Sequence, residues 1–270
     1  MWMIDVIIIF SVIIILYILA LRGRVGHPTL GSLRGWSYAH RGLHDNVYPE
    51  NSMAAFQRAL EAGYGMELDV HLMADSNLAV IHDSSLKRTA DLDKIIEYMT
   101  FEELSMCKLE GTQERIPLLK DVLDMVAGRV PLIVEIKSEG NNYAAVAEAV
   151  CRALQNYKGL YCVESFDPRV VYYVRKHYPD FVRGQLAHNS LCEKSSVPWI
   201  LRFLLTYDLL NFLVLPDFIA YRYKDRKTLS NFLCRKLWRV QGVSWTITDE
   251  KQYHTAKKEG WVPIFENFKP

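Results

Sequence analysis

The chain opens with an almost unbroken run of apolar residues. Residues 1–21 contain one charged side chain, Asp5, near the amino end of the run. About 20 apolar residues in a helix are enough to cross the hydrocarbon core of a bilayer. No basic segment precedes the run and no small-residue cleavage site follows it, which favours a retained anchor over a removed signal peptide. We therefore expect a transmembrane helix over residues 1–21.

The segment after this run is rich in glycine and basic. Residues 22–36 hold four glycines and a proline, a composition typical of a linker. The same stretch carries three arginines: Arg22, Arg24 and Arg34. Because basic residues favour the cytoplasmic side of a membrane, the domain that follows is predicted to be cytoplasmic. We expect one catalytic domain over residues 37–270.

From residue 37 onward, short apolar segments alternate with amphipathic ones. The strands are predicted at 37–42, 66–72, 78–82, 131–137, 160–166, 182–187, 218–223 and 243–248. Helical patterns lie between most of them, at 52–62, 118–127, 143–157, 169–177, 228–238 and 249–258. Eight strands interleaved with helices predict an α/β fold, a (β/α)₈ TIM barrel. An open doubly wound sheet shows the same alternation, and the pattern alone does not exclude it.

The connection between the sixth and seventh predicted strands is unusually apolar. Residues 197–216 have the length of a membrane span, but Arg202, Asp208 and Asn211 make spanning expensive. The apolar residues surround most of a helical wheel, which is more than one barrel flank covers. We expect this helix to lie in the membrane interface, with ordinary packing on the barrel as the alternative.

Composition and charge narrow the range of partners. The chain has 270 residues, half of them hydrophobic, and a formal net charge of +1. This is enough for one large domain, and the near-neutral charge gives no reason to expect nucleic acid as a partner. The five cysteines are scattered without a metal-binding spacing, which is typical of reduced thiols.

Charged residues stand at the ends of several predicted strands, at a spacing of two. Glu67 and Asp69 would share one face of the second strand, because alternate side chains of a strand point the same way. Paired carboxylates provide the oxygen ligands that a hard cation, Mg²⁺ or Ca²⁺, prefers. Glu135 and Lys137 repeat this spacing at the end of the fourth strand.

Two histidines end neighbouring strands, His40 beside Arg41 and His82 beside Asp83. Such a pair could supply a general base and a general acid. Arg41 also offers a planar fork that suits the oxygens of a phosphodiester. Because the carboxyl ends of barrel strands meet at one rim, we expect these groups to lie together. The residues therefore predict a metal-assisted phosphoryl-transfer site.

An ordered set of short motifs across residues 36–268 resembles the glycerophosphodiester phosphodiesterase family. The motifs are His40-Arg41-Gly42, Pro49-Glu50-Asn51-Ser52, Glu67-Leu68-Asp69-Val70, His82-Asp83, Leu86-Lys87-Arg88-Thr89, Ile116-Pro117-Leu118-Leu119, Val134-Glu135-Ile136-Lys137, Glu164-Ser165-Phe166-Asp167-Pro168 and Trp245-Thr246-Ile247-Thr248. The segment 261–268 departs from the usual family pattern. The resemblance implies the TIM barrel and a divalent cation as cofactor.

The resemblance also implies roles for individual residues. They are metal ligation by Glu67, Asp69 and Glu135, acid and base catalysis by His40 and His82, and phosphate binding by Arg41 and Lys137. Glu50 would either touch the metal or orient Arg41 and His40. Trp245, Gln185 and His71 are candidates for the pocket wall, with plain packing as the alternative for His71 and Trp245.

The implied reaction is hydrolysis of a glycerophosphodiester to glycerol phosphate and an alcohol such as choline or ethanolamine. The neighbouring glycerol hydroxyl would attack, giving a cyclic phosphate that water then opens. Two alternatives stay open. The same polar groups would serve a lysophospholipase D or sphingomyelinase D-like activity on lipids, and an inactive relative would be a membrane-tethered binding barrel.

Overall fold

A closed ring of parallel strands forms the centre of the molecule in the computed structural model, which describes residues 2–191, 193 and 197–270. The ring consists of β1 (Tyr38–Ala39), β2 (Gly65–Leu72), β4 (Leu132–Ile136), β5 (Tyr161–Ser165), β6 (Arg183–Ala187), β7 (Phe218–Arg222), β8 (Gln241–Ile247) and β9 (Trp261–Phe265). β1 pairs in parallel with both β2 and β9, and this pairing closes the barrel. The predicted (β/α)₈ fold is confirmed, and the open sheet is excluded.

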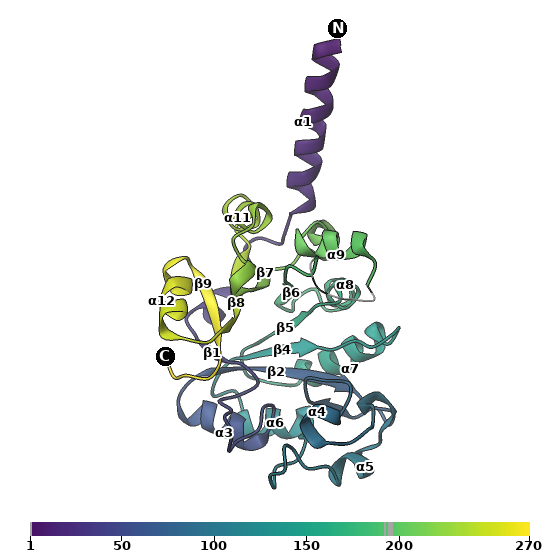
Figure 1. The fold of residues 1–270 in the computed structure, drawn as a ribbon, viewed down its shortest axis with the longest axis vertical. Coiled ribbons are helices and arrows are strands. Elements are labelled where there is room, and N and C mark those ends of the chain that lie inside the picture. Colours follow the sequence, from purple (N-terminus) through teal and green to yellow (C-terminus); the bar gives the residue numbers. More distant parts are fainter. Residues whose placement is uncertain (1, 192, 194–196) are drawn as a thin grey trace.

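Helices surround the ring, as Figure 1 shows. The main ones are α3 (Met53–Glu61), α6 (Leu119–Val126), α7 (Tyr143–Gln155), α8 (Pro168–His177), α11 (Leu229–Lys236) and α12 (Glu250–Lys258), close to the predicted ranges. Ser52 caps α3 by accepting a hydrogen bond from the Ala55 N–H at 3.1 Å, and Asp249 caps α12 from the Gln252 N–H at 2.8 Å. A cap of this kind typically stabilises a helix by about 1 kcal/mol.

One predicted barrel strand lies outside the ring. β3 (Leu78–Val80) runs antiparallel to β2, with Val80 opposite Val70, so the two form a hairpin. The connection between them is too short for anything else, since neighbouring parallel strands need a crossover of roughly a dozen residues or more. The eighth barrel strand is instead β9, in the carboxyl-terminal segment that departs from the family pattern.

A small subdomain follows the β2–β3 hairpin. It contains α4 (Lys87–Ala90), the 3₁₀ helix η1 (Ile96–Tyr98) and α5 (Phe101–Ser105). Its own apolar cluster, which includes Ile81, Leu86 and Leu104, is separate from the main core. This cluster holds the chain that carries His82 against the edge of the barrel.

The predicted linker is packed against the barrel. It contains a short helix, α2 (Leu30–Arg34), whose Leu30 and Leu33 are buried among residues such as Phe218 near the amino ends of the strands. Gly23 lies so close to the chain that a Cβ would come within 2.4 Å of Val240, and therefore no larger residue fits. The Arg24 guanidinium forms an ion pair with the buried carboxylate of Asp217. These contacts hold residues 22–36 against the amino-terminal end of the barrel.

The amino-terminal helix α1 (Trp2–Ala20) projects away from the barrel (Figure 1) and buries none of its residues. In the part of the chain that the structure describes, it is the one helix long and apolar enough to cross a membrane. Its root is anchored, because Leu21 is fully buried in a cluster with Ile219 and Val240. The Trp238 indole N–H also donates to the Ile18 carbonyl at 2.8 Å.

The apolar stretch 197–216 forms two short helices, α9 (Trp199–Thr206) and α10 (Asn211–Val214), and not the single helix that was predicted. The chain turns between them at Asp208, whose φ of 57° is left-handed. The Asp208 carboxylate is buried and accepts a hydrogen bond from the Ser230 hydroxyl at 3.2 Å. This contact favours the turn over a continuous helix.

Candidate active site

Three carboxylates converge at the carboxyl-terminal rim of the barrel. Glu67 and Asp69 belong to β2, and Glu135 lies on β4 directly opposite Asp69 in the strand register. One oxygen of each lies within 4.8 Å of the others, and all three side chains are buried. The predicted metal-binding residues are therefore brought together, because strand periodicity places them on the same face of adjacent strands.

The charges of this cluster are only partly compensated. The Lys137 ammonium lies 2.9 Å from Asp69 Oδ1 and 2.7 Å from Glu135 Oε1. Burial alone would raise the pKa of Asp69, but Lys137 and Arg41 outweigh it and hold that pKa well below its ordinary value. Burial raises the pKa of Glu135 to about 7, and burial together with the neighbouring Asp69 raises the pKa of Glu67 well above normal. The raised pKa values of the two glutamates show that their ionised forms lack sufficient positive charge nearby. A hard cation would supply that charge and fits this all-oxygen donor set.

The loop after β1 holds Arg41 against the cluster. Arg41 has a left-handed backbone, with a φ of 53°, and its N–H donates to Glu67 Oε2 at 2.9 Å. Its guanidinium donates to Glu50 Oε1 at 2.9 Å and lies 3.4 Å from Asp69 Oδ2. Glu50 also accepts a hydrogen bond from Arg88 at 2.7 Å. In this arrangement Glu50 orients Arg41, and it lies outside the group of three carboxylates.

The Pro-Glu-Asn-Ser motif contributes one site residue that the sequence analysis did not single out. Asn51 is buried, and its side-chain amide donates to Asp69 Oδ2 at 2.8 Å. The next residue, Ser52, caps α3. The motif therefore starts a helix and orients a carboxylate in consecutive positions, which explains why both residue types are needed there.

Each of the two histidines has a carboxylate on its Nδ1. His40 Nδ1 lies 2.6 Å from Glu266 Oε2, and His82 Nδ1 lies 2.6 Å from Asp83 Oδ1. A carboxylate that accepts from Nδ1–H makes Nε2 the nitrogen available for proton transfer. His40 Nε2 lies 3.9 Å from Glu67 Oε2, at the edge of the carboxylate cluster. Burial lowers the pKa of His82.

Glu266 is the second site residue that sequence reasoning missed. It follows β9, so it reaches the same rim as the residues that follow β1, although 226 positions separate it from His40. Burial alone would raise its pKa, but the hydrogen bond from His40 outweighs burial and lowers the pKa to about 2. Its position directly after an apolar segment was the one available signal.

Another buried acid, Glu164, lies beside the cluster on β5. It is paired in register with Glu135, and burial together with the neighbouring carboxylates raises its pKa well above normal. Burial and the neighbouring carboxylates thus both oppose ionisation of Glu164.

A cavity of about 880 Å³ begins at this site and extends to α9. Glu135 and Lys137 line one end, and Leu201 and Leu205 of α9 line the other. Phe166 is part of the wall, and Trp245 packs edge-to-face against it with 5.6 Å between the ring centres. Trp245 thus supports the wall from behind, and its indole N–H donates to the Ala220 carbonyl.

Two residues expected in the pocket wall lie elsewhere. Gln185 is buried, and its amide nitrogen donates to the carbonyls of Ser165, Phe166 and Leu186. His71 is also buried, with Nδ1 2.5 Å from Glu97 Oε1 and Nε2 3.2 Å from the His82 carbonyl. Both side chains are therefore used to hold backbone segments in place, and neither lines the cavity.

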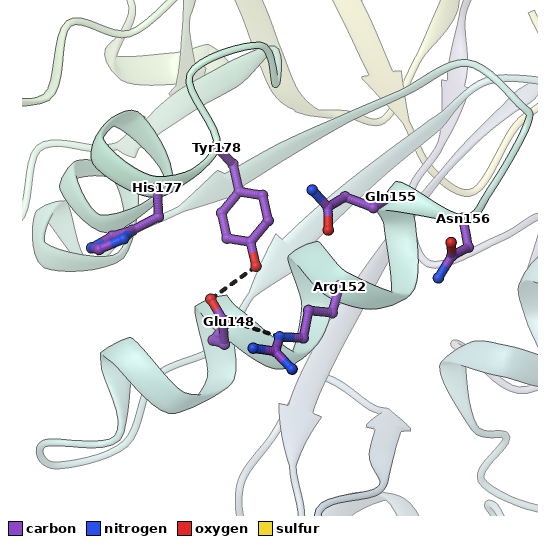
Figure 2. A pocket seen from close by; sticks show the side chains of 6 residues that line it. All are labelled: Glu148, Arg152, Gln155, Asn156, His177 and Tyr178. Atoms are coloured by element: carbon purple, nitrogen blue, oxygen red, sulfur yellow. Dashed lines mark hydrogen bonds and ion pairs between the residues drawn. The ribbon is translucent and has the colours of Figure 1, made fainter.

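A second hollow lies on the outer surface, between α7 and α8 (Figure 2). It is about 550 Å³ in volume and is lined by Glu148, Arg152, Gln155, Asn156, His177 and Tyr178. Glu148 is already engaged, since it accepts hydrogen bonds from Tyr178 and Arg152. None of its six lining residues stands at the end of a strand, whereas the carboxylates and histidines do, so the rim of the barrel is the candidate active site.

Known proteins share this sequence pattern and fold. The profile of the glycerophosphoryl diester phosphodiesterase family matches residues 40–211. A glycerophosphodiester phosphodiesterase of Caldanaerobacter subterraneus is 35% identical over 173 residues, which cover 60% of this chain and 68% of that protein. One of Bacillus altitudinis is 38% identical over 130 residues, which cover 45% of this chain and 53% of that protein. A lysophospholipase D of Rattus norvegicus is 34% identical over 134 residues, or 44% of this chain and 41% of that protein.

Some of these matches span only part of the relative, so the chain aligns with about half the length of the Bacillus protein. Among solved structures, a phosphodiesterase of Oleispira antarctica in complex with the product sn-glycerol-3-phosphate superposes with a TM-score of 0.73. That match covers 87% of this chain and 94% of the other at 21% identity, and it supports the fold alone. The family profile covers well over half of the chain and includes both histidines and all three carboxylates. The chain belongs to the glycerophosphoryl diester phosphodiesterase family.

Proposed function

We propose that this protein hydrolyses glycerophosphodiesters to glycerol phosphate and an alcohol, with the help of a divalent cation. The proposal rests on one observation: a cluster of carboxylates and a pair of histidines lie together at the carboxyl-terminal rim of the barrel. Three buried carboxylates lie together, and beside them stand two histidines, each held at Nδ1 by a carboxylate of its own.

The proposed cation is Mg²⁺ or Ca²⁺, held by Glu67, Asp69 and Glu135. When bound, it would neutralise negative charge on the phosphate oxygens. Arg41 and Lys137 lie at the same rim and supply further positive charge for the phosphate. Glu50 and Asn51 keep Arg41 and Asp69 in place through the hydrogen bonds described above.

The two histidines would divide the proton transfers. One takes the proton from the glycerol hydroxyl next to the phosphate, and the hydroxyl oxygen then bonds to phosphorus. The other gives a proton to the departing alcohol oxygen as its bond to phosphorus breaks. Water then opens the cyclic phosphate with the roles reversed, which returns both histidines to their starting states.

The test is turnover of glycerophosphocholine by the purified full-length protein in detergent. We expect activity to be lost in excess chelator and restored by Mg²⁺ or Ca²⁺. Glu67→Gln and Asp69→Asn should abolish turnover with little change in thermal stability, because each removes a charge and a ligand. Glu148→Gln, in the outer hollow, is the matched control and should leave turnover unchanged. Full activity in chelator would refute the proposed metal dependence.

The far end of the cavity favours a second substrate class. Apolar side chains form much of the cavity wall: Ile136, Phe166, Leu186, Ala187, Val197, Leu201 and Leu205. Charged residues, among them Arg169, Glu193 and Arg202, line it as well. The apolar part of the wall suits an acyl chain, so a lysophospholipase D activity on lysophospholipids is the second candidate. Leu201→Ser and Leu205→Ser should then reduce turnover of lysophosphatidylcholine and spare glycerophosphocholine. An equal loss on both substrates would contradict this second activity.

We also propose that α1 is a retained single-pass anchor, with residues 37–270 as the catalytic domain on the cytoplasmic side. The helix has the length and apolarity required, and Arg22 is exposed directly after it. Membrane fractionation, amino-terminal sequencing and protease protection of the expressed protein test this. A soluble protein that lacks residues 1–21 would show that they are a removed signal peptide.

A further inference from the structure

The helices around the root of α1 have apolar side chains on their outer faces. We call this set of exposed residues the apolar collar: Trp199 and Ile200 of α9, Phe212 and Leu213 of α10, and Leu229, Phe232 and Leu237 at α11. A surface that faces water normally carries polar side chains in such helices. The collar therefore needs an explanation that barrel packing does not supply.

α11 shows the reversal most clearly. Leu229 and Phe232 are 64% and 58% exposed and lie one helical turn apart. Leu237, the C-cap residue, is exposed as well, and Lys236 is the basic residue on the same side. The opposite face holds Ser230 and Asn231, which are buried. Both polar side-chain atoms of Asn231 lack a hydrogen-bond partner among the described residues. The helix thus buries polar groups at a cost and leaves apolar ones outside.

The α9–α10 region repeats the pattern. In α10, Asn211 is buried, whereas the next two residues, Phe212 and Leu213, are exposed. Between the two helices, Asp208 is buried, and one of its carboxylate oxygens has no partner among the described residues. α10, the turn at Asp208 and α11 therefore bury polar side chains, and both helices expose large apolar ones.

The collar surrounds the point where α1 leaves the barrel. Tyr17 of α1, Leu209 of the α9–α10 turn and Leu233 of α11 all pack on the cluster that holds Leu21. Figure 1 shows α9 and α11 on either side of the base of α1. α1 buries none of its apolar side chains in the protein, so lipid is the environment that can cover them. The collar residues lie on helices next to the base of α1, so the same lipid would reach them.

We propose that the apolar collar docks the barrel on the lipid surface, with the collar side chains inserted at the level of the headgroups. This inference rests on the proposed membrane anchor. Interfacial helices typically combine Trp, Phe and Leu with basic residues. Here Trp199 belongs to the collar, and the exposed Arg22 lies 6.0 Å from the ring of Trp238 beside the α1 root.

Docking would bring the apolar end of the cavity to the bilayer. α9 carries Trp199 and Ile200 in the collar, and the same helix supplies Leu201 and Leu205 to the cavity wall. A lipid substrate could then enter from the membrane side of α9 with its acyl chain along this wall. The collar therefore connects the membrane anchor with the choice of substrate.

Depth-dependent quenching tests the proposal on the full-length protein, one copy per phosphatidylcholine nanodisc. Single cysteines for an environment-sensitive fluorophore replace Phe232, Leu213 or Trp199 in a Cys192→Ser background, since the other four cysteines are buried. Met106→Cys is the matched control, because Met106 is the exposed C-cap residue of α5, and Figure 1 shows α5 at the opposite end of the molecule from α1. Ile14→Cys reports on α1 itself.

We expect roughly twofold or greater quenching by lipid with a quencher near the headgroups at all three collar positions, because interfacial helices insert about 5–10 Å. Met106→Cys should be unaffected. Ile14 is read with lipid that carries the quencher on the acyl chain, because a spanning α1 would hold Ile14 in the hydrocarbon core. Quenching at Ile14 by that lipid, without headgroup-level quenching at the collar, would overturn docking and leave the anchor intact. No quenching at Ile14 would refute the anchor itself.

Two further measurements complete the test. The fluorophore emission at the collar is also compared between one and two copies per nanodisc. If it shifts to the blue only with two copies, and lipid does not quench it, the collar binds a second copy of the protein and the proposal is overturned. Each labelled variant should keep its glycerophosphocholine turnover, because no collar residue lies in the catalytic site. Quenching in a variant that is still active supports docking and excludes unfolding as the cause.

Discussion

Two helices of the outer layer, α6 and α11, arrange their residues in opposite ways. α6 buries Leu119, Val122, Leu123 and Val126 against the barrel and exposes Lys120, Asp121 and Asp124. α11 buries Ser230 and Asn231 together with Cys234, and it exposes Leu229 and Phe232. Both helices are eight residues long and cover strands of the same closed barrel. This difference is what the proposed docking requires, with water over the outer face of α6 and lipid over that of α11.

The buried polar groups differ between the same two sides of the barrel. On the side of β2 and β4, Asp69 is paired with Lys137, Arg41 and Asn51. Near α11, Asp208 has the Ser230 hydroxyl as its partner, and Asn231 has none for its side chain among the described residues. On the first side, each buried charge of this group lies beside an opposite charge. On the second side the buried polar groups lie beneath an apolar outer surface.

The largest expected effect is on the catalytic side. His40→Ala and His82→Ala should each reduce glycerophosphocholine turnover by roughly 10²- to 10⁴-fold, the usual cost of a lost general acid or base. Cation affinity, measured by calorimetry, should hardly change. A substrate with an acidic leaving group should rescue the variant that lacks the acid. A loss of only a few-fold in both variants would show that the histidines are structural.

Glu266→Gln should have the next largest effect. The amide keeps the size of the side chain but no longer holds the His40 ring with a charged acceptor. In serine proteases, removing the charge of the carboxylate that orients the catalytic histidine lowers turnover by roughly 10⁴-fold. We expect a smaller loss of turnover for Glu266→Gln. Glu266→Asp should recover part of the activity. A change in KM alone, with kcat preserved, would argue against a role through His40.

The comparison of α6 with α11 can be tested by matched leucine truncations. Leu119→Ala removes a fully buried side chain, so it should lower the free energy of unfolding by about 2–5 kcal/mol. Leu229→Ala removes an exposed one, so in detergent it should change stability by less than about 0.5 kcal/mol. Chemical denaturation of both variants measures the difference. Equal losses would mean that the outer face of α11 is packed against protein.

The last prediction concerns pH and the buried Asp208. Burial raises its pKa in the folded protein to about 7, above the value of 3.8 for an exposed aspartate. The folded state therefore holds the proton more tightly, and stability falls as the pH rises between these two values. The slope contributed by Asp208 is at most about 1.4 kcal/mol per pH unit. Asp208→Asn should remove this slope between pH 5 and 7 in thermal unfolding curves. An unchanged slope would mean that Asp208 is already ionised in the fold.

Much of the site was predictable because its residues follow local rules. Alternate side chains of a strand point the same way, so Glu67 and Asp69 had to share a face, and strand ends of a barrel meet at one rim. The amino-terminal helix was equally clear from its length and apolarity. For Glu50 the sequence left two hypotheses, contact with the metal or orientation of Arg41 and His40. Its hydrogen bond with Arg41 favours the second.

The sequence by itself determined the family, the alternation of strands and helices and the identity of the charged rim, because these depend on short motifs and periodicity. The tertiary structure alone decided the rest. It paired Glu266 with His40 across the whole chain, placed β3 outside the ring and β9 inside it, and turned α11 with its polar face inward. These features depend on which distant segments come into contact and on the surroundings of each surface. Neither can be inferred from the sequence pattern within a single segment.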